Sequence, residues 1–280
     1  MAFDSIATDR LQALIQDLQA HALSPRPANR LGVFMSGSRV GLATAEVARF
    51  LAERLPRFRI EPGALVLADA DLDFHSRTDL LTDASLQLRA AGLTFAWRDE
   101  PLEIRAGHNQ PVLATIERAV CRTLGITTLA VHMNALAADG RLFVAQRSAT
   151  KKIDPGLWDN LVGGMVPAGE SAEAALAREA WEEAGLRPGD FSATRGRRFL
   201  VDRPVPEGWM SEMIQVFDAR VGIGVTPVNQ DGEVGAIDCR RLTDVLTGIE
   251  AGEFTLEASL ATLDLLARRA GLSSPSRFYR

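Results

Sequence analysis

Cysteine is scarce in this chain of 280 residues, which contains only Cys121 and Cys239. Because there is no CxxC pair and no Cys/His cluster, the sequence predicts neither a disulfide framework nor a zinc site. The chain also lacks an apolar run of membrane-spanning length, and its amphipathic N-terminus is unlike a signal peptide. These absences predict a cytoplasmic protein in a reducing compartment, with no membrane partner.

An excess of positive charge is absent as well. The 31 Lys and Arg residues are outnumbered by 36 Asp and Glu residues, which gives a formal net charge of −5. Proteins that bind nucleic acids usually present a basic surface, so this balance argues against a nucleic-acid partner. The turn around Gly37 and Gly41 lacks the GK[ST] ending of a phosphate loop. We therefore expect a small molecule as the ligand, bound elsewhere in the chain.

The chain exceeds the usual length of one domain, and its predicted elements change character near Gly125. Before Gly125 the hydrophobic pattern predicts four helices with short strands between them, and the helices are expected at 3–23, 44–55, 78–91 and 111–124. After Gly125 it predicts mainly strands, followed by helices at 242–250 and 256–270. We predict an α/β domain over residues 1–125 and a second domain over 126–280, with a mixed sheet covered on both faces.

A short helix with well-defined ends is predicted in the second half of the chain. Ser171 is a good N-cap, the residues after it are strong helix formers, and Gly185 is placed to end the helix. At about 100° per residue, Ala180, Trp181 and Ala184 fall on the side away from the acidic residues. That side is expected to pack against the protein.

The other side of this helix carries three carboxylates, Glu179, Glu182 and Glu183. Carboxylates at this spacing repel one another, and a divalent cation would remove the repulsion. Arg178 precedes Glu182 by four residues, where it can hold that side chain in one rotamer. Mg²⁺ prefers hard oxygen ligands and often shares them with substrate phosphates, so the pattern favours diphosphate chemistry over a merely solvated acidic helix.

The spacing from Gly164 to Leu186 fills every position of G-x5-E-x7-R-E-U-x-E-E-x-G-U, where U is apolar, and resembles the Nudix box; Ala180 is a small choice for U. The stretches RSATKKIDPGLWDNLVGGMVPAGES, WRDE and DGEV extend the resemblance over most of the chain, to Nudix proteins related to thiamine pyrophosphokinase. The resemblance implies an α/β (α+β) fold. It consists of a Nudix α/β/α sandwich with a mixed sheet, preceded by a smaller α/β domain.

The resemblance also implies an activity, which is hydrolysis of a small organic diphosphate with Mg²⁺ or Mn²⁺ as the cofactor. The implied substrate is an oxidised or oxo-substituted thiamine diphosphate, cleaved to its monophosphate. The implied metal ligands are Glu179, Glu182, Glu183, Gly164 and Glu170. The implied catalytic residues are Glu182, Glu179, Arg178 and the loop residue Glu233, with Glu212 as the alternative to Glu233. Either Glu182 or Glu233 would activate water, and a homodimer is a candidate assembly.

Cationic residues precede the box, and they are candidates for binding the substrate. Arg147, Lys151 and Lys152 could hold phosphate oxygens, although a solvated basic loop would have the same composition. Trp158 is a further candidate for substrate binding, and the alternative for this residue is a place in the core.

Three other functions are compatible with a Nudix box. The first is a pyrophosphatase for nucleoside diphosphate derivatives such as ADP-ribose or a dinucleotide, and the second is a ligand-sensing module without catalysis. The third is isopentenyl diphosphate isomerase, which requires a cysteine on the strand before the box. Here that strand reads Asn160-Leu-Val-Gly-Gly, so the sequence argues against the isomerase.

Overall fold

The computed structural model describes residues 8–107, 110–272 and 278–279. Up to residue 124 its elements are α1 (Thr8–Ala22), β1 (Arg30–Met35), β2 (Ser38–Thr44), α2 (Ala45–Arg54), β3 (Phe58–Glu61), β4 (Ala64–Leu67), α3 (Phe74–Ala90), β5 (Pro101–Arg105), β6 (Val112–Glu117) and α4 (Arg118–Leu124). The later elements are β7 (Thr127–Leu136), β8 (Leu142–Arg147), β9 (Trp158–Asn160), β10 (Val162–Met165), α5 (Ala172–Ala184), β11 (Phe191–Val205), β12 (Gly208–Val221), β13 (Val234–Arg240), α6 (Leu242–Glu250), α7 (Leu256–Arg269) and β14 (Phe278–Tyr279).

The N-terminal elements form a four-stranded sheet in the order β2-β1-β4-β3, in which β1 and β4 run parallel. Helices α2, α3 and α4 share one apolar core with this sheet and with the β5-β6 hairpin. The helix predicted over 111–124 is wrong in its first half, because residues 112–117 form β6. Ala114 and Ile116 are buried in alternation there, and this period of two suits a strand paired with β5.

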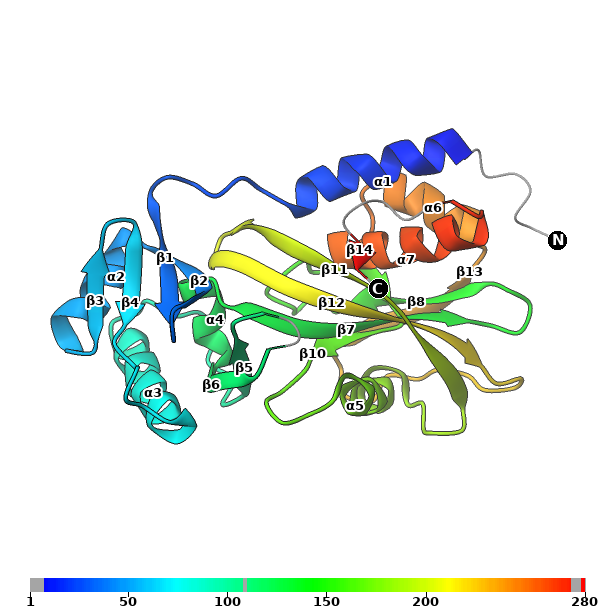
Figure 1. Cartoon of the computed structure of the whole chain (residues 1–280). Helices are drawn as coiled ribbons and strands as arrows, with labels where there is room; N and C mark the ends of the chain where they lie inside the picture. Colours follow the sequence, from blue (N-terminus) through cyan, green and yellow to red (C-terminus); the bar gives the residue numbers. More distant parts are fainter. Residues whose placement is uncertain (1–7, 108–109, 273–277, 280) are drawn as a thin grey trace.

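The second half is built on an eight-stranded mixed sheet with the main order β13-β8-β7-β12-β11-β14. Strand β7 pairs in parallel with β12, whereas β10 pairs antiparallel with β7 and β9 pairs antiparallel with β8. Helix α5 lies on one side of the sheet, and α6 and α7 lie on the other side (Figure 1). The prediction of a mixed sheet covered on both faces is therefore confirmed. No helix in the described ranges is long and apolar enough to span a membrane.

Helix α1 belongs by sequence to the N-terminal region but packs against the second half. It runs along α7 (Figure 1), and Leu11 and Ile15 are buried in one core with α6 and α7. Residues 3–7 of the predicted first helix lie outside the described residues. A boundary at residue 125 stays a prediction, and α1 crosses back over it.

Helix α4 connects the two halves through two close backbone approaches. A Cβ atom on Gly41 would lie 2.3 Å from the Leu124 carbonyl oxygen, and one on Gly208 would lie 2.1 Å from the Arg122 carbonyl oxygen. These distances are shorter than any ordinary contact, so only glycine lets β2 and the β11-β12 turn approach α4 this closely. The contacts fix α4 beside β12, at the edge of the candidate site.

Candidate active site

Helix α5 carries the acidic residues, and its ends form as the sequence predicts. The Ser171 hydroxyl accepts a hydrogen bond from the Ala174 amide at 3.1 Å, and Gly185 ends the helix in a left-handed conformation with φ of 64°. Ala180 and Ala184 are buried against the sheet. The prediction that Trp181 packs with them is wrong, because this residue is 41% exposed.

Strand β10 fixes two of the box carboxylates through its glycines. The Gly163 amide donates a hydrogen bond to Glu183 Oε2 at 2.8 Å. A Cβ atom on Gly164 would lie 2.0 Å from Glu179 Oε1, so the Glu179 carboxylate occupies the space that any side chain at residue 164 would need. The glycine at the start of the box therefore has a steric role in this chain.

Arg178 binds three of the box carboxylates together, those of Glu170, Glu179 and Glu182. Its Nη1 donates to Glu179 at 2.8 Å and to Glu182 at 3.1 Å, and its Nη2 donates to Glu170 at 3.1 Å. Nη2 also donates to the Met165 carbonyl at 3.2 Å, which ties the cluster to β10. Burial alone would lower the pKa of Arg178, but the surrounding glutamates raise it above its ordinary value. All five residues assigned to metal binding thus lie around Arg178 or beside β10.

Burial raises the pKa of two of these glutamates. Desolvation raises the pKa of Glu183 well above its ordinary value, and the nearby Glu179 adds to the effect. Desolvation also raises the pKa of Glu179, against the opposing effect of Arg178. Buried carboxylates of like charge are stabilised as anions when a cation approaches them.

The donor set fits a hard divalent cation. Carboxylate oxygens are the ligands that Mg²⁺ and Mn²⁺ prefer, and those of Glu179, Glu182 and Glu183 line one cavity. In the part of the chain that the structure describes, no three His, Cys, Asp or Glu side chains are already placed as a metal-binding group.

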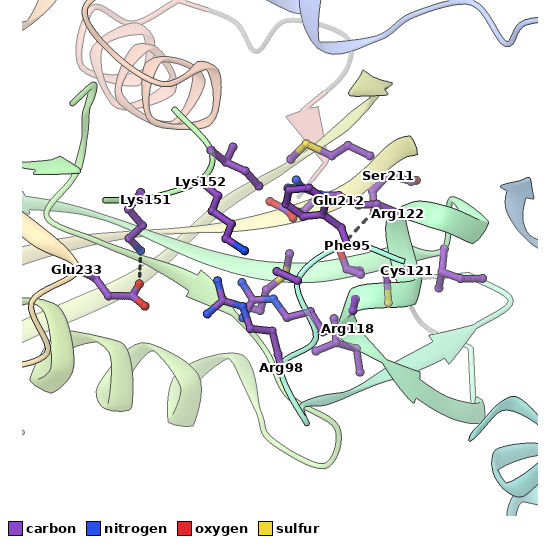
Figure 2. A pocket seen from close by; sticks show the side chains of 18 of the residues that line it. Phe95, Arg98, Arg118, Cys121, Arg122, Lys151, Lys152, Ser211, Glu212 and Glu233 are labelled. Atoms are coloured by element: carbon purple, nitrogen blue, oxygen red, sulfur yellow. Dashed lines mark hydrogen bonds and ion pairs between the residues drawn. The ribbon is translucent and has the colours of Figure 1, made fainter. Parts of the chain in front are cut away.

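The cavity beside α5 has a volume of about 770 Å³ and also collects positive charge. Six of the cationic side chains that line it come from three separate parts of the sequence: Arg98, Arg118, Arg122, Arg147, Lys151 and Lys152. Figure 2 shows Arg98 and Arg118 on one side of an adjoining pocket, with Lys151 paired to Glu233 on another. The acidic box and this cationic surface thus enclose a common space.

The predicted substrate-binding residues divide into two groups. Lys151 and Lys152 line the cavity, and Lys152 also lies 5.6 Å from the Phe95 ring. Arg147 lines it too, but its guanidinium is held by the Ile153 carbonyl at 2.8 Å and by Asp159 at 3.2 Å, so it also supports its own loop. Trp158 is not among the lining residues. It packs in the core of α6 and α7 beneath Arg240, because β9 turns its ring away from the box.

Several lining residues were not expected from the sequence. His132 on β7 lines the cavity and shares a 2.9 Å hydrogen bond with Asn160, and Glu257 reaches the cavity from α7. Arg118 and Arg122 arrive on α4, in the segment whose first half was mistaken for a helix. WRDE was the only signal available for this side of the cavity, and its Arg98 lines the wall. No local pattern relates α4 to a box some fifty residues later.

The comparisons with known proteins agree with this geometry. A family model described as the NUDIX domain matches residues 127–259, and one described as a domain of unknown function, DUF4743, matches residues 11–128. An uncharacterised Nudix hydrolase of Pseudomonas aeruginosa is 31% identical over 136 residues, which cover 49% of this chain and 75% of the relative. The chain belongs to the Nudix family. Members of this family generally use divalent metal ions.

Two other relatives extend the comparison. The chloroplastic Nudix hydrolase 20 of Arabidopsis thaliana is 29% identical over 218 residues, covering 72% of this chain and 56% of the relative. This Nudix chain thus spans little more than half the length of that protein. The isopentenyl-diphosphate Delta-isomerase of Salmonella arizonae is 34% identical over 141 residues, covering 49% of this chain and 75% of the relative.

Proposed function

We propose that this protein is a divalent-metal-dependent hydrolase that cleaves the diphosphate linkage of a small organic diphosphate. The observation that carries this proposal is the shared cavity, in which the box glutamates face a wall of arginine and lysine side chains. A diphosphate needs both surfaces, since cations bind its oxygens and carboxylates hold the metal that neutralises its charge. A cavity of this composition is poorly suited to a neutral or cationic substrate.

In this proposal, one group of residues binds the metal and another group binds the phosphate oxygens of the substrate. Glu179, Glu182 and Glu183 would hold the metal, with Glu170 and the Gly164 carbonyl as accessories. A bound divalent cation would supply charge neutralisation on the phosphate oxygens. Arg98, Arg118 and Lys152 bind phosphate oxygens from the opposite wall.

Two residues compete for the role of activating water. Glu182 is 41% exposed in its side chain and accepts a hydrogen bond from Arg178, which positions it at the cavity. Glu233 also lines the cavity, but its carboxylate is paired with Lys151. Each carboxylate is held by a cationic side chain and keeps further lone pairs for water, so both Glu182 and Glu233 stay candidates for the general base.

For the group attached to the diphosphate, we propose an oxidised or oxo-substituted thiamine. Two of the short motifs on which the resemblance to the thiamine-related subgroup rests contribute to the cavity, through Arg98 of WRDE and Glu233 of DGEV. The alternative substrates are ADP-ribose and dinucleotides. Isomerase activity is not favoured, because the cysteine that it requires is absent from β10.

A turnover panel tests this proposal. Oxidised and oxo-substituted thiamine diphosphates, ADP-ribose, dinucleotides and isopentenyl diphosphate are each incubated with the full chain and Mg²⁺ or Mn²⁺, and the products are separated by chromatography. We expect the thiamine analogues to be cleaved to monophosphates with the highest kcat/KM. If ADP-ribose or a dinucleotide is cleaved better, the thiamine assignment is wrong. Tight binding without any product would instead identify a sensing module.

A further inference from the structure

A smaller lobe adjoins the cavity and shares part of its lining. Its volume is about 180 Å³, and its lining combines the apolar side chains of Phe95, Leu102, Ile126, Met165 and Met210 with the six cationic side chains that it shares with the larger cavity. None of the box glutamates lines this lobe. An apolar cavity of roughly 150 Å³ is enough to hold a benzene ring, so the lobe has room for one substituted six-membered ring. Phe95 is 43% exposed and offers a face on which such a ring can stack.

Glu212 on β12 lies where the lobe joins the larger cavity, since it lines both. Figure 2 shows it among the side chains that surround the lobe. The residue is only 5% exposed, and within the described ranges no hydrogen-bond donor contacts its carboxyl group. The residue as a whole is buried, but its carboxyl oxygens are accessible from the cavity, so they are open to a ligand that donates hydrogen bonds.

The charged side chains near Glu212 do not donate a hydrogen bond to its carboxyl group. Desolvation raises the pKa of Glu212, and the charges of Arg122 and His132 oppose this effect without reaching hydrogen-bond distance. Arg122 is instead engaged with Glu207 at 3.5 Å. Glu257 on α7, which lines the larger cavity, has its own pKa raised by burial and by Glu212.

We infer that the lobe binds a nitrogen heterocycle carrying an exocyclic amino group next to a ring nitrogen, and that Glu212 is the specificity-determining residue that recognises this edge. The inference rests on the proposed function, because the diphosphate must reach from this ring to the box. A carboxylate accepts hydrogen bonds from the amino group and from a protonated ring nitrogen. A neutral carboxyl group accepts from the amino group and donates to the bare ring nitrogen, so the edge is complementary in either state.

Equilibrium binding to matched diphosphates tests the inference. The full chain is titrated calorimetrically with cytidine and uridine diphosphate, with adenosine and inosine diphosphate, and with a thiamine diphosphate oxidised on its thiazole ring and the 4-oxo-pyrimidine counterpart of that compound. Both members of the thiamine pair thus carry the oxidation proposed above. Within each pair an oxo group replaces the amino group. We expect the amino member of the best-bound pair to bind at least about tenfold more tightly, as for a buried polar group with and without its partner.

Glu212→Met keeps the length of the side chain but removes its hydrogen bonding, and it should reduce the ratio of the two dissociation constants to about twofold or less. Replacing a buried charged group by an apolar one of similar volume is often neutral for folding, and thermal unfolding checks this. Glu61→Gln on the exposed strand β3 is the control and should keep the wild-type ratio.

Three results would overturn the inference. They are equal binding of both members of the best pair by the wild type, no binding of any pair, and an unchanged ratio in Glu212→Met. The first needs no variant, so it stands even if the variant does not fold. A wild type that discriminates in binding but releases no monophosphate would contradict the hydrolase proposal and leave this inference intact.

Discussion

Replacing Glu182 by Gln should lower kcat strongly while it lowers the stability of the fold only slightly. The Glu182 side chain is 41% exposed, and its interaction with Arg178 at 3.1 Å is one of several that Arg178 makes. An exposed ion pair of this kind contributes about 1 kcal/mol or less, and the Gln carbonyl can still accept the hydrogen bond. For a chain of this size that loss lowers Tm by about 2–4 °C at most.

The same change removes a negative charge from the proposed reacting centre. Loss of one such electrostatic contribution lowers kcat by about 100-fold or more, which corresponds to about 2.7 kcal/mol in the barrier. The predicted effect on catalysis therefore exceeds the predicted effect on folding. Steady-state kinetics at saturating Mg²⁺ and thermal unfolding followed by circular dichroism measure the two quantities on the same sample.

Glu173→Gln is the matched control for this experiment. Glu173 lies on the same helix and pairs with Arg195 at the surface, outside the cavity. It should lose a comparable amount of stability and keep its kcat. Near-normal turnover by the Glu182 variant, or an equal loss of kcat in both variants, would refute the reasoning.

Three further predictions concern other parts of the structure. Burial raises the pKa of Glu183, so the folded state holds this proton more tightly than the unfolded state, and in metal-free buffer stability falls as pH rises above the ordinary value of 4.5. Glu183→Gln should therefore raise Tm at about pH 8 and leave it unchanged at about pH 4; a lower Tm at the higher pH would contradict this. Gly164→Ala should displace the Glu179 carboxylate and lower kcat by about 100-fold while circular dichroism stays normal, whereas wild-type kinetics would show that the carboxylate is not required there. Leu11→Ala should cost about 3 kcal/mol in urea unfolding because α1 packs on α7, and a loss below about 1 kcal/mol would mean that α1 is dispensable.

The acidic helix was predictable because its signals are local. Ser171, Gly185 and the box spacing each act within a few residues, so the helix ends and the clustering of carboxylates follow from the sequence alone. The angular positions of residues around the helix do not by themselves decide which side of α5 packs against the sheet. Apart from Leu176, the apolar residues of α5 that are buried against the sheet are alanines. Trp181 lies outside this stripe, where it stacks with Arg187 at 4.7 Å.

The opposite wall of the cavity could not be predicted, since it depends on contacts between distant segments. Arg118 and Arg122 reach the site because Gly41 and Gly208 let neighbouring backbone approach α4. Glycine at these positions looks in the sequence like an ordinary turn residue. The same limit applies to Trp158, whose direction depends on the pairing of β9 with β8.

The central claim is that this site uses water and a divalent cation to cleave a diphosphate. The most direct measurement is to incubate the full chain with the best substrate of the panel in ¹⁸O-labelled water, once with Mg²⁺ and once with a chelator. The masses of the products are then measured by mass spectrometry. The account predicts two phosphate-bearing products, with one ¹⁸O atom in one of them, formed only with the cation. Cleavage that persists in the chelator, or products without the label, would contradict it.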